Sequence, residues 1–245
     1  TVHHVYDPRL TELDGELRVV TALDTSRGGR LALWTAVGDA AGGFGGLERL
    51  NLVGTTGDHD TRNGVLFPER IGGRWLMLER PNSAAPPGGP PTGGVITLLA
   101  SEDLRRWDPV GQVMAGRPHY WDELIGAGPP PVKTREGWLL LYHGVATHFL
   151  GANLYQAGAV LLDLEDPRVV LGRTRDNLLE PREIWEMTGQ VPNVVFPSGL
   201  TVAKTDRDGF AASNSELRLY YGGADTVVGL AVAKVEDVVA ACDAP

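Results

Sequence analysis

Basic side chains stand at three places in the sequence where they could bind an anion. Arg62 and Arg80 bracket an apolar stretch, and Lys133 follows the tight segment Gly-Ala-Gly-Pro-Pro-Pro. The planar guanidinium of arginine suits two-point binding of phosphate or carboxylate, and the Gly-Pro turn would hold Lys133 in a defined place. The alternatives are surface salt bridges, which contribute little to stability, and a solvated lysine.

Two aspartates are the acidic counterparts of these cations. Asp7 lies in His-His-Val-Tyr-Asp-Pro-Arg-Leu, residues 3–10, and Asp225 lies in Tyr-Tyr-Gly-Gly-Ala-Asp-Thr, residues 220–226. Loop carboxylates commonly bind ligands, although an Asp before Pro often only initiates a turn and Asp225 could cap one. The Asp-Pro-Arg tripeptide recurs at residues 166–168, where the turn is the better interpretation.

A fourfold repeat of short strands must position these side chains. Turns near residues 14, 72, 136 and 215 each open a short apolar run, and second runs follow at 30–37, 94–100, 157–164 and 227–235. Short, evenly spaced strands between Gly and Pro turns favour a β-propeller over a sandwich. The sequence therefore predicts an all-β protein with four blades. Two short helices are expected, at 103–107 and 235–242, and neither could cover a parallel sheet.

The composition excludes several classes of protein. The 245 residues carry a net charge of −9, which opposes binding to nucleic acid or to anionic membranes. No apolar run approaches the roughly 18 residues of a membrane helix, and we expect a single cytoplasmic domain over residues 1–245. The lone cysteine, Cys242, excludes an internal disulfide and a thiolate zinc cage, and the histidines lack metal-ligand spacing with carboxylates. The Pro- and Gly-rich segment 81–94 is interpreted as a surface loop, with a lid as the alternative.

Five motifs, in this order, resemble those of glycoside hydrolase family 130, the mannosyl phosphorylases. They read Arg-Asn-x-x-Leu-Phe-Pro-Glu, Gly-Ala-Gly-Pro-Pro-Pro-x-Lys-Thr, Gly-Trp-Leu-Leu-x-Tyr-His-Gly, Pro-Asn-Val-Val-Phe-Pro-x-Gly and Tyr-Tyr-Gly-x-Ala-Asp-Thr. The resemblance covers residues 5–231 and implies a five-bladed β-propeller with its active site in a central funnel. About four blades are expected here, because only six residues precede Asp7. We therefore expect a truncated or a naturally short chain, whose exposed strand edges contact between copies could cover.

The resemblance also implies roles for eight residues. Asp7 would be the catalytic acid, acting through a hydroxyl of the bound mannose. The phosphate-binding residues would be Arg62, Asn63, Arg80 and Lys133, and the substrate-binding residues would be His143, Tyr155 and Asp225. Tyr6 and Ser198 depart from the family pattern, and neither is expected to touch the chemistry. An inverting glycosidase usually needs two carboxylates, whereas phosphate is already an anionic nucleophile, so one acid with several cations fits a phosphorylase.

The resulting hypothesis is an inverting phosphorylase that cleaves a β-mannosidic bond with inorganic phosphate and gives α-mannose 1-phosphate. Its expected partners are a mannosyl oligosaccharide and phosphate, without metal or organic cofactor, nucleic acid or membrane, and as a homo-oligomer. A β-mannosidase of the same fold that uses water is one alternative. A noncatalytic sugar-binding propeller is the other.

Overall fold

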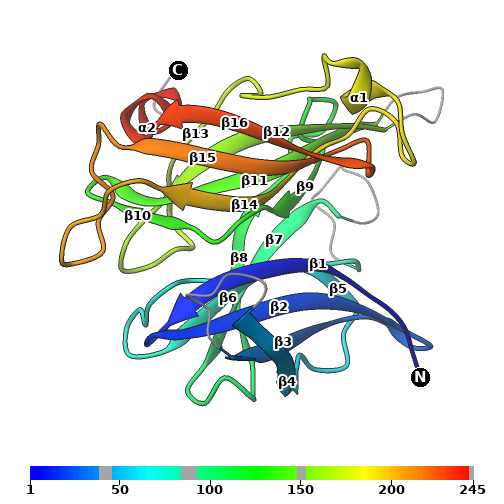
Figure 1. Ribbon diagram of the computed structural model, residues 1–245, viewed down its shortest axis with the longest axis vertical. Coiled ribbons are helices and arrows are strands. Elements are labelled where there is room, and N and C mark those ends of the chain that lie inside the picture. The colour runs from blue at the N-terminus through cyan, green and yellow to red at the C-terminus, as the bar shows by residue number, and fades with distance from the viewer. Residues whose placement is uncertain (39–45, 84–92, 148–152, 243–245) are drawn as a thin grey trace.

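The computed structural model describes residues 1–38, 46–83, 93–147 and 153–242, and they form four antiparallel sheets in chain order. We call each sheet a blade (Figure 1). Blade 1 contains β1 (Val2–Leu13), β2 (Glu16–Thr25), β3 (Gly28–Gly38) and β4 (Leu47–Thr55), and blade 2 contains β5 (Thr61–Leu66), β6 (Trp75–Pro81), β7 (Val95–Ser101) and β8 (Asp108–Ala115). Blade 3 contains β9 (Leu124–Ala127), β10 (Val132–Thr134), β11 (Gly137–Thr147), β12 (Asn153–Leu162) and β13 (Val170–Arg173), and blade 4 contains β14 (Val195–Val202), β15 (Glu216–Gly223) and β16 (Val227–Lys234). The predicted all-β fold with four blades is confirmed, and the five-bladed ring stays a prediction.

The repeat found in the sequence corresponds to the second strand of blades 1, 2 and 4, namely β2, β6 and β15, and to β11, the third strand of blade 3. Blade 1 shows the local cause. Leu13 pairs with Glu16, so Asp14 and Gly15 form a two-residue turn with φ of 51° and 77°. A tight hairpin turn with both central residues at positive φ matches the twist of antiparallel strands and favours Asp-Gly.

One of the two predicted helices is present. Helix α2 (Val235–Cys242) begins with acidic residues in its first turn and buries Val238 and Val239. The helix expected at residues 103–107 is wrong, because the Asp103 side chain accepts hydrogen bonds from the backbone N–H groups of Arg105 and Arg106 and holds a turn there. A short helix that the sequence did not indicate, α1 (Ile184–Met187), precedes β14. The predicted loop at 81–94 begins with the last residue of β6, and its residues 84–92 lie outside the described part.

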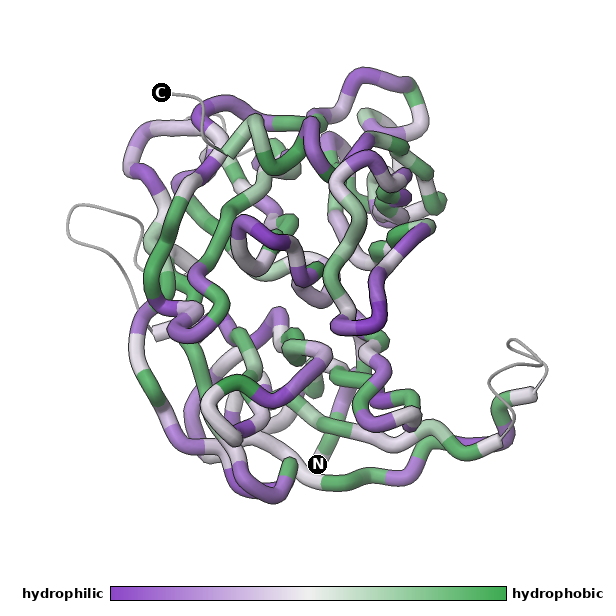
Figure 2. Tube along the Cα trace, turned by 90° about the vertical axis from the view of Figure 1, so that its left-hand side faces the viewer, coloured by the Kyte–Doolittle hydropathy of each residue, from purple (hydrophilic) through white to green (hydrophobic). Residues whose placement is uncertain are grey.

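Neighbouring blades pack face to face, and alternate residues of a strand enter different interfaces. In β11, Trp138 and Leu140 pack toward blade 2, whereas Leu139 and Leu141 pack toward blade 4 and α2. The Trp138 ring meets Phe67 of blade 2 edge to face at 5.3 Å. Because both faces of β11 are buried, its sequence is almost continuously apolar. Figure 2 shows hydrophobic and hydrophilic stretches in alternation along the chain, with hydrophilic residues in many of the outer bends.

Blade 4 presents one apolar face to solvent. Val228, Leu230 and Val232 of β16 are 77%, 53% and 55% exposed and alternate along the strand, so they share one face. Leu217 and Leu219 of the neighbouring β15 belong instead to the buried cluster against blade 3. Within the described ranges, no helix has the length and apolar character needed to cross a membrane.

Candidate active site

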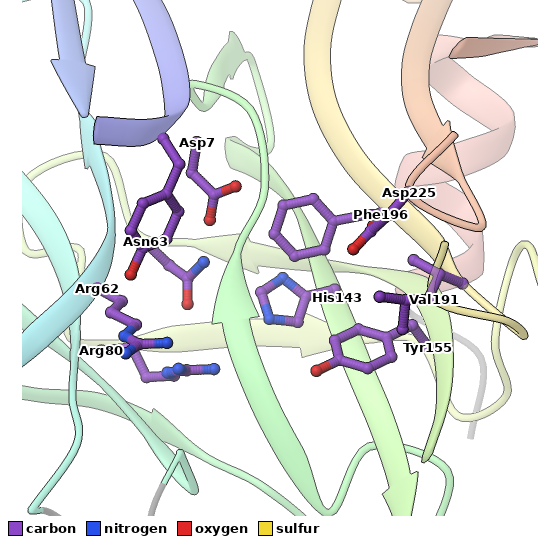
Figure 3. Close-up of a pocket in the computed structure, with 11 residues that line it drawn as sticks. Asp7, Arg62, Asn63, Arg80, His143, Tyr155, Val191, Phe196 and Asp225 are labelled. Carbon is purple, nitrogen blue, oxygen red and sulfur yellow. The ribbon is translucent and has the colours of Figure 1, made fainter. Parts of the chain in front are cut away.

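A cavity of about 310 Å³ lies where the four blades meet, and its walls come from all four of them. Figure 3 shows the side chains that line it. Seven of the eight site residues predicted from the sequence are among them: Asp7, Arg62, Asn63, Arg80, His143, Tyr155 and Asp225. The structure thus brings together residues that are up to 218 positions apart in the chain. The remaining lining residues are Tyr6, Val191, Val194 and Phe196.

Asp7 and Asn63 reach the cavity from irregular points in the first strands of blades 1 and 2. The β1–β2 register shifts between Tyr6 and Arg9, and the β5–β6 register shifts between Arg62 and Val65. Asp7 and Asn63 both have φ of 53°, a left-handed conformation that Asp and Asn tolerate better than most residues. Such bulges re-aim side chains, so each strand turns one polar group toward the cavity.

Arg62 and Arg80 form a cationic pair on one side of the cavity. They are directly opposite each other in the β5–β6 ladder, where two like charges repel. Their only polar side-chain contacts within the described part are long, at 3.4 Å, from Arg62 to Asp24 and from Arg80 to Asn82. The Nε atoms of both are buried without a protein partner in that part of the chain. Burial lowers the pKa of Arg80, and the charge of Arg62 adds to this effect. An anion between the two would relieve the repulsion and supply the missing acceptors.

His143 lies at the centre of the cavity in a regular part of β11 (Figure 3). It is only 1% exposed, and its Nδ1 has no partner among the described residues. Burial, together with the charges of Arg80 and Arg9, holds the pKa of His143 well below 6.5, so the imidazole is neutral at pH 7. A neutral imidazole carries one donor and one acceptor, and it suits a sugar hydroxyl as well as a phosphate oxygen.

Space for His143 is provided by the strand beside it. Gly126 of β9 pairs with His143 in the ladder, and a Cβ atom at Gly126 would lie 2.6 Å from His143 Nε2 and 2.8 Å from Asn63 Oδ1. The glycine of the Gly-Ala-Gly-Pro motif therefore allows two polar side chains to approach the backbone.

Aromatic rings form the other wall. Phe196 is 4.7 Å from the His143 ring and Tyr155 is 6.0 Å from it, measured between centroids. Apolar and aromatic surface beside a few polar groups is typical of a site for an organic ligand. Phe196 belongs to the Pro-Asn-Val-Val-Phe-Pro motif, so the sequence contains a signal for it, although the resemblance assigns it no role.

Asp225 approaches the cavity from the turn between β15 and β16. Ala224 and Asp225 are consecutive residues with positive φ, at 46° and 49°. Loss of solvent, together with the charge of Asp7, raises the pKa of Asp225. The cavity therefore contains two carboxyl groups, and the charge of Asp7 acts on Asp225.

Lys133 is not brought to the cavity, and its predicted convergence with Arg62 and Arg80 is wrong. Its Nζ forms an ion pair with Glu69 Oε1 at 2.7 Å and lies 4.5 Å from the Phe210 ring centroid. In the ladder Lys133 pairs with Trp138, whereas His143 is five residues farther along β11, or about 17 Å away. The Gly-Pro turn thus places the lysine at the end of the strand remote from the cavity.

Tyr6, which was expected not to touch the chemistry, lines the cavity. Its hydroxyl donates to Asp24 Oδ1 at 2.9 Å, and the Arg62 guanidinium lies 5.8 Å from its ring centroid. Burial and the hydrogen bond to Asp24 raise the pKa of Tyr6 to about 12. Tyr6 therefore lies beside the predicted site residues because it precedes the bulge at Asp7, and whether it takes part in the chemistry stays a prediction.

Comparison with known proteins shows the family to which this chain is related. The family model described as beta-1,4-mannooligosaccharide phosphorylase matches residues 2–244. The chain is 36% identical to the 1,2-beta-oligomannan phosphorylase of Thermoanaerobacter sp. (strain X514), covering 74% of this chain and 53% of that protein. It is 38% identical to the Beta-1,4-mannooligosaccharide phosphorylase of Ruminococcus albus, covering 73% and 49%.

A solved structure is also similar to this chain. The Beta-1,2-Mannobiose phosphorylase from Listeria innocua, in complex with beta-1,2-mannobiose, superposes with a TM-score of 0.79 at 31% identity, covering 98% of this chain and 60% of that chain. The chain spans about half the length of the two curated relatives above. Because the family model matches almost every residue, the chain belongs to glycoside hydrolase family 130.

Proposed function

We propose that this cavity carries out phosphorolysis of a β-mannosidic bond. The observation that carries the proposal is the pair Arg62 and Arg80, opposite each other with buried donors that lack a partner in the described chain, in one cavity with Asp7. An inorganic phosphate between the guanidinium groups would be held and turned toward the sugar. Positioning of this kind supplies much of the rate enhancement in reactions of an anionic nucleophile.

In the proposed reaction, a phosphate oxygen attacks the anomeric carbon of the mannosyl unit from the face opposite the leaving group. The new C–O bond forms while the glycosidic C–O bond breaks, and the configuration changes from β to α. Asp7 supplies the proton that the departing oxygen needs, through a hydroxyl of the bound mannose, so the products are α-mannose 1-phosphate and a shortened acceptor. Arg62, Asn63 and Arg80 hold phosphate, and His143, Tyr155 and Asp225 hold the mannosyl unit.

The test is product analysis with β-1,2- and β-1,4-linked mannobiose and longer oligosaccharides, in the presence and absence of phosphate. These linkages are chosen because they appear in the names of the relatives. Phosphorus and proton NMR should show α-mannose 1-phosphate only when phosphate is present. Binding of the sugar without turnover would instead indicate a noncatalytic propeller.

Hydrolysis is the second candidate, because Asp225 is a second carboxyl group in the cavity. Inverting hydrolases use one carboxyl as acid and another as base to activate water. Equal rates with and without phosphate, with mannose as the product, would establish this alternative. The unsatisfied arginine pair favours phosphate.

We also propose a homo-oligomer in which contact between copies covers the exposed row Val228, Leu230 and Val232 of β16. Sedimentation should give a mass above the 26.3 kDa of one chain, and Leu230→Lys should lower the measured mass. A wild-type monomer at all concentrations would contradict the proposal.

The reaction is proposed to need no metal or organic cofactor, since phosphate is itself the nucleophile and arginine offsets its charge. Treatment with a chelator should therefore leave the rate unchanged. A cytoplasmic location is proposed as well, and cell fractionation tests it.

A further inference from the structure

Arg9, the third residue of the Asp-Pro-Arg segment, is a buried charge that the proposed reaction does not use. It is 1% exposed, and within the described part of the chain it has no carboxylate within 4.0 Å. Its Nη2 atom is buried without a partner in that part, and its Nη1 donates only to the carbonyl of Pro8 at 3.3 Å. A buried charge is expensive to keep, so a particular role for this guanidinium is expected.

The contacts of Arg9 join three blades. Arg9 belongs to β1 of blade 1 and follows Asp7 by two residues, at the far end of the bulge that turns Asp7 toward the cavity. Its Nε donates to the carbonyl of Gly128 at 2.8 Å, in the turn between β9 and β10 of blade 3. Its guanidinium lies 5.2 Å from the ring centroid of Phe196, on β14 of blade 4.

We propose that Arg9 is a positioning residue that holds Asp7 in its reacting position by tying the β1 bulge to the Gly128 turn and to the Phe196 wall. This inference rests on the proposed function. Strand β1 pairs with no strand of blade 3 or blade 4 in a ladder, so the tie joins separate blades behind the cavity wall rather than through a sheet. Since a misplacement of about 1 Å can cost about a hundredfold in rate, a tie at this point bears directly on the chemistry.

The electrostatic influence of Arg9 agrees with its position. The pKa of His143 is lowered first by burial, then by the charge of Arg80 and then by that of Arg9. Burial also lowers the pKa of Arg9 itself, and the charge of Asp7 opposes that effect. Arg9 therefore lies near enough to both residues to influence the cavity from behind its wall, although it does not line the cavity.

Arg9→Lys is the main test. Lysine keeps the positive charge but lacks the planar guanidinium, which in Arg9 donates to the Gly128 carbonyl and also lies beside the Phe196 ring. We expect kcat to fall by about tenfold or more, while KM for phosphate changes by less than about threefold because Arg62 and Arg80 are intact. A kcat within twofold of wild type would overturn the proposal. If Arg9→Lys does not fold, Arg9→Gln, which keeps an N–H donor but loses the guanidinium beside Phe196, is measured instead, and the same two outcomes apply.

The matched control is Arg30→Lys. Arg30 is also buried in blade 1, and its guanidinium bonds the backbone carbonyls of Gly29, Asp58 and His59 without lining the cavity. Its substitution should lower the urea midpoint without a comparable fall in kcat. An equal fall in kcat at an equal loss of stability would assign Arg9 a purely structural role and overturn the proposal.

The experiment separates this inference from the proposed function. A wild-type protein that releases no α-mannose 1-phosphate contradicts the proposed function, whatever the variants do. The tie is then tested by crystal structures of the wild type and of Arg9→Met. A displaced Asp7 bulge in the variant supports the inference, and superposable Asp7 and Phe196 side chains overturn it.

Discussion

At the scale of single residues, the site depends on two facing cations, and among the described residues only Arg62 has a carboxylate near it, Asp24 at 3.4 Å. Arg62 and Arg80 are ladder partners, and their closest polar side-chain contacts within the described residues are 3.4 Å long. Lys133, by contrast, already has Glu69 at 2.7 Å. The two arginines therefore have N–H donors left to bind phosphate, whereas the ammonium group of Lys133 is already paired with Glu69.

Substitution of an arginine and of the lysine tests this difference between them. Arg62→Met should raise KM for phosphate by about 10- to 100-fold, because a hydrogen bond to a charged group contributes about 1.5–3 kcal/mol. Lys133→Met, the matched control, should leave that KM within about threefold. Initial rates at varied phosphate provide the measurement, and a similar rise for both variants would return Lys133 to the site.

Asp7 offers a second test at this scale. Asp7→Asn should lower kcat by about a hundredfold or more, because a positioned general acid contributes about that much and an amide has no such proton to donate. Asparagine tolerates the φ of 53°, so the urea midpoint should stay near that of the wild type. Turnover retained in a folded Asp7→Asn protein would remove Asp7 from the proposed role.

At the scale of secondary structure, bulges and close strand approaches turn side chains toward the cavity. Asp7 and Asn63 lie at register shifts of β1 and β5, and His143 lies opposite the one residue type that leaves it room, Gly126. A regular ladder would alternate side chains between two blade interfaces and would place fewer of them at the cavity.

Gly126→Ala tests the close approach in β9. The added Cβ would overlap His143 Nε2 at 2.6 Å and Asn63 Oδ1 at 2.8 Å, so both side chains must move. We expect kcat/KM to fall by about tenfold or more, with a modest loss of stability. Gly199→Ala on β14 is the control, since its nearest neighbour, Tyr220 Cβ, would be at 3.5 Å. Equal kinetics for the two variants would contradict the assigned role of Gly126.

At the scale of the whole molecule, four sheets converge on the cavity, and their packing buries a histidine at its centre. Interfaces between neighbouring blades are filled by alternate residues of the same strands, as in β11. This packing holds His143 at 1% exposure. The protonation of one side chain is therefore linked to the stability of the entire fold.

Stability against pH should show that link. The pKa of His143 lies well below 6.5 in the folded state, so below pH 6.5 the unfolded chain binds a proton that the folded chain does not. Burial of the neutral imidazole therefore contributes its full free energy to folding above pH 6.5. This contribution is lost as the pH falls from 6.5 toward the pKa of His143 in the folded state. Urea unfolding between pH 7.5 and 5 should show a shallower pH dependence in His143→Gln than in wild type. His3→Gln, at an exposed position, should behave as wild type, and parallel curves for His143→Gln would contradict the burial argument.

The sequence by itself determined the strands, the blades and most of the site. A turn such as Asp14-Gly15 and the alternation of apolar residues each depend on a few neighbouring positions. The sequence of a short segment therefore predicts them. Only the tertiary structure decided which side chains share the cavity. Lys133 is directed to Glu69 instead. Tyr6 gains its place beside Arg62 of blade 2, and Arg9 of blade 1 gains its place beside Phe196 of blade 4. Those contacts join residues up to 187 positions apart, and the direction of each side chain depends on register and bulges that distant strands impose.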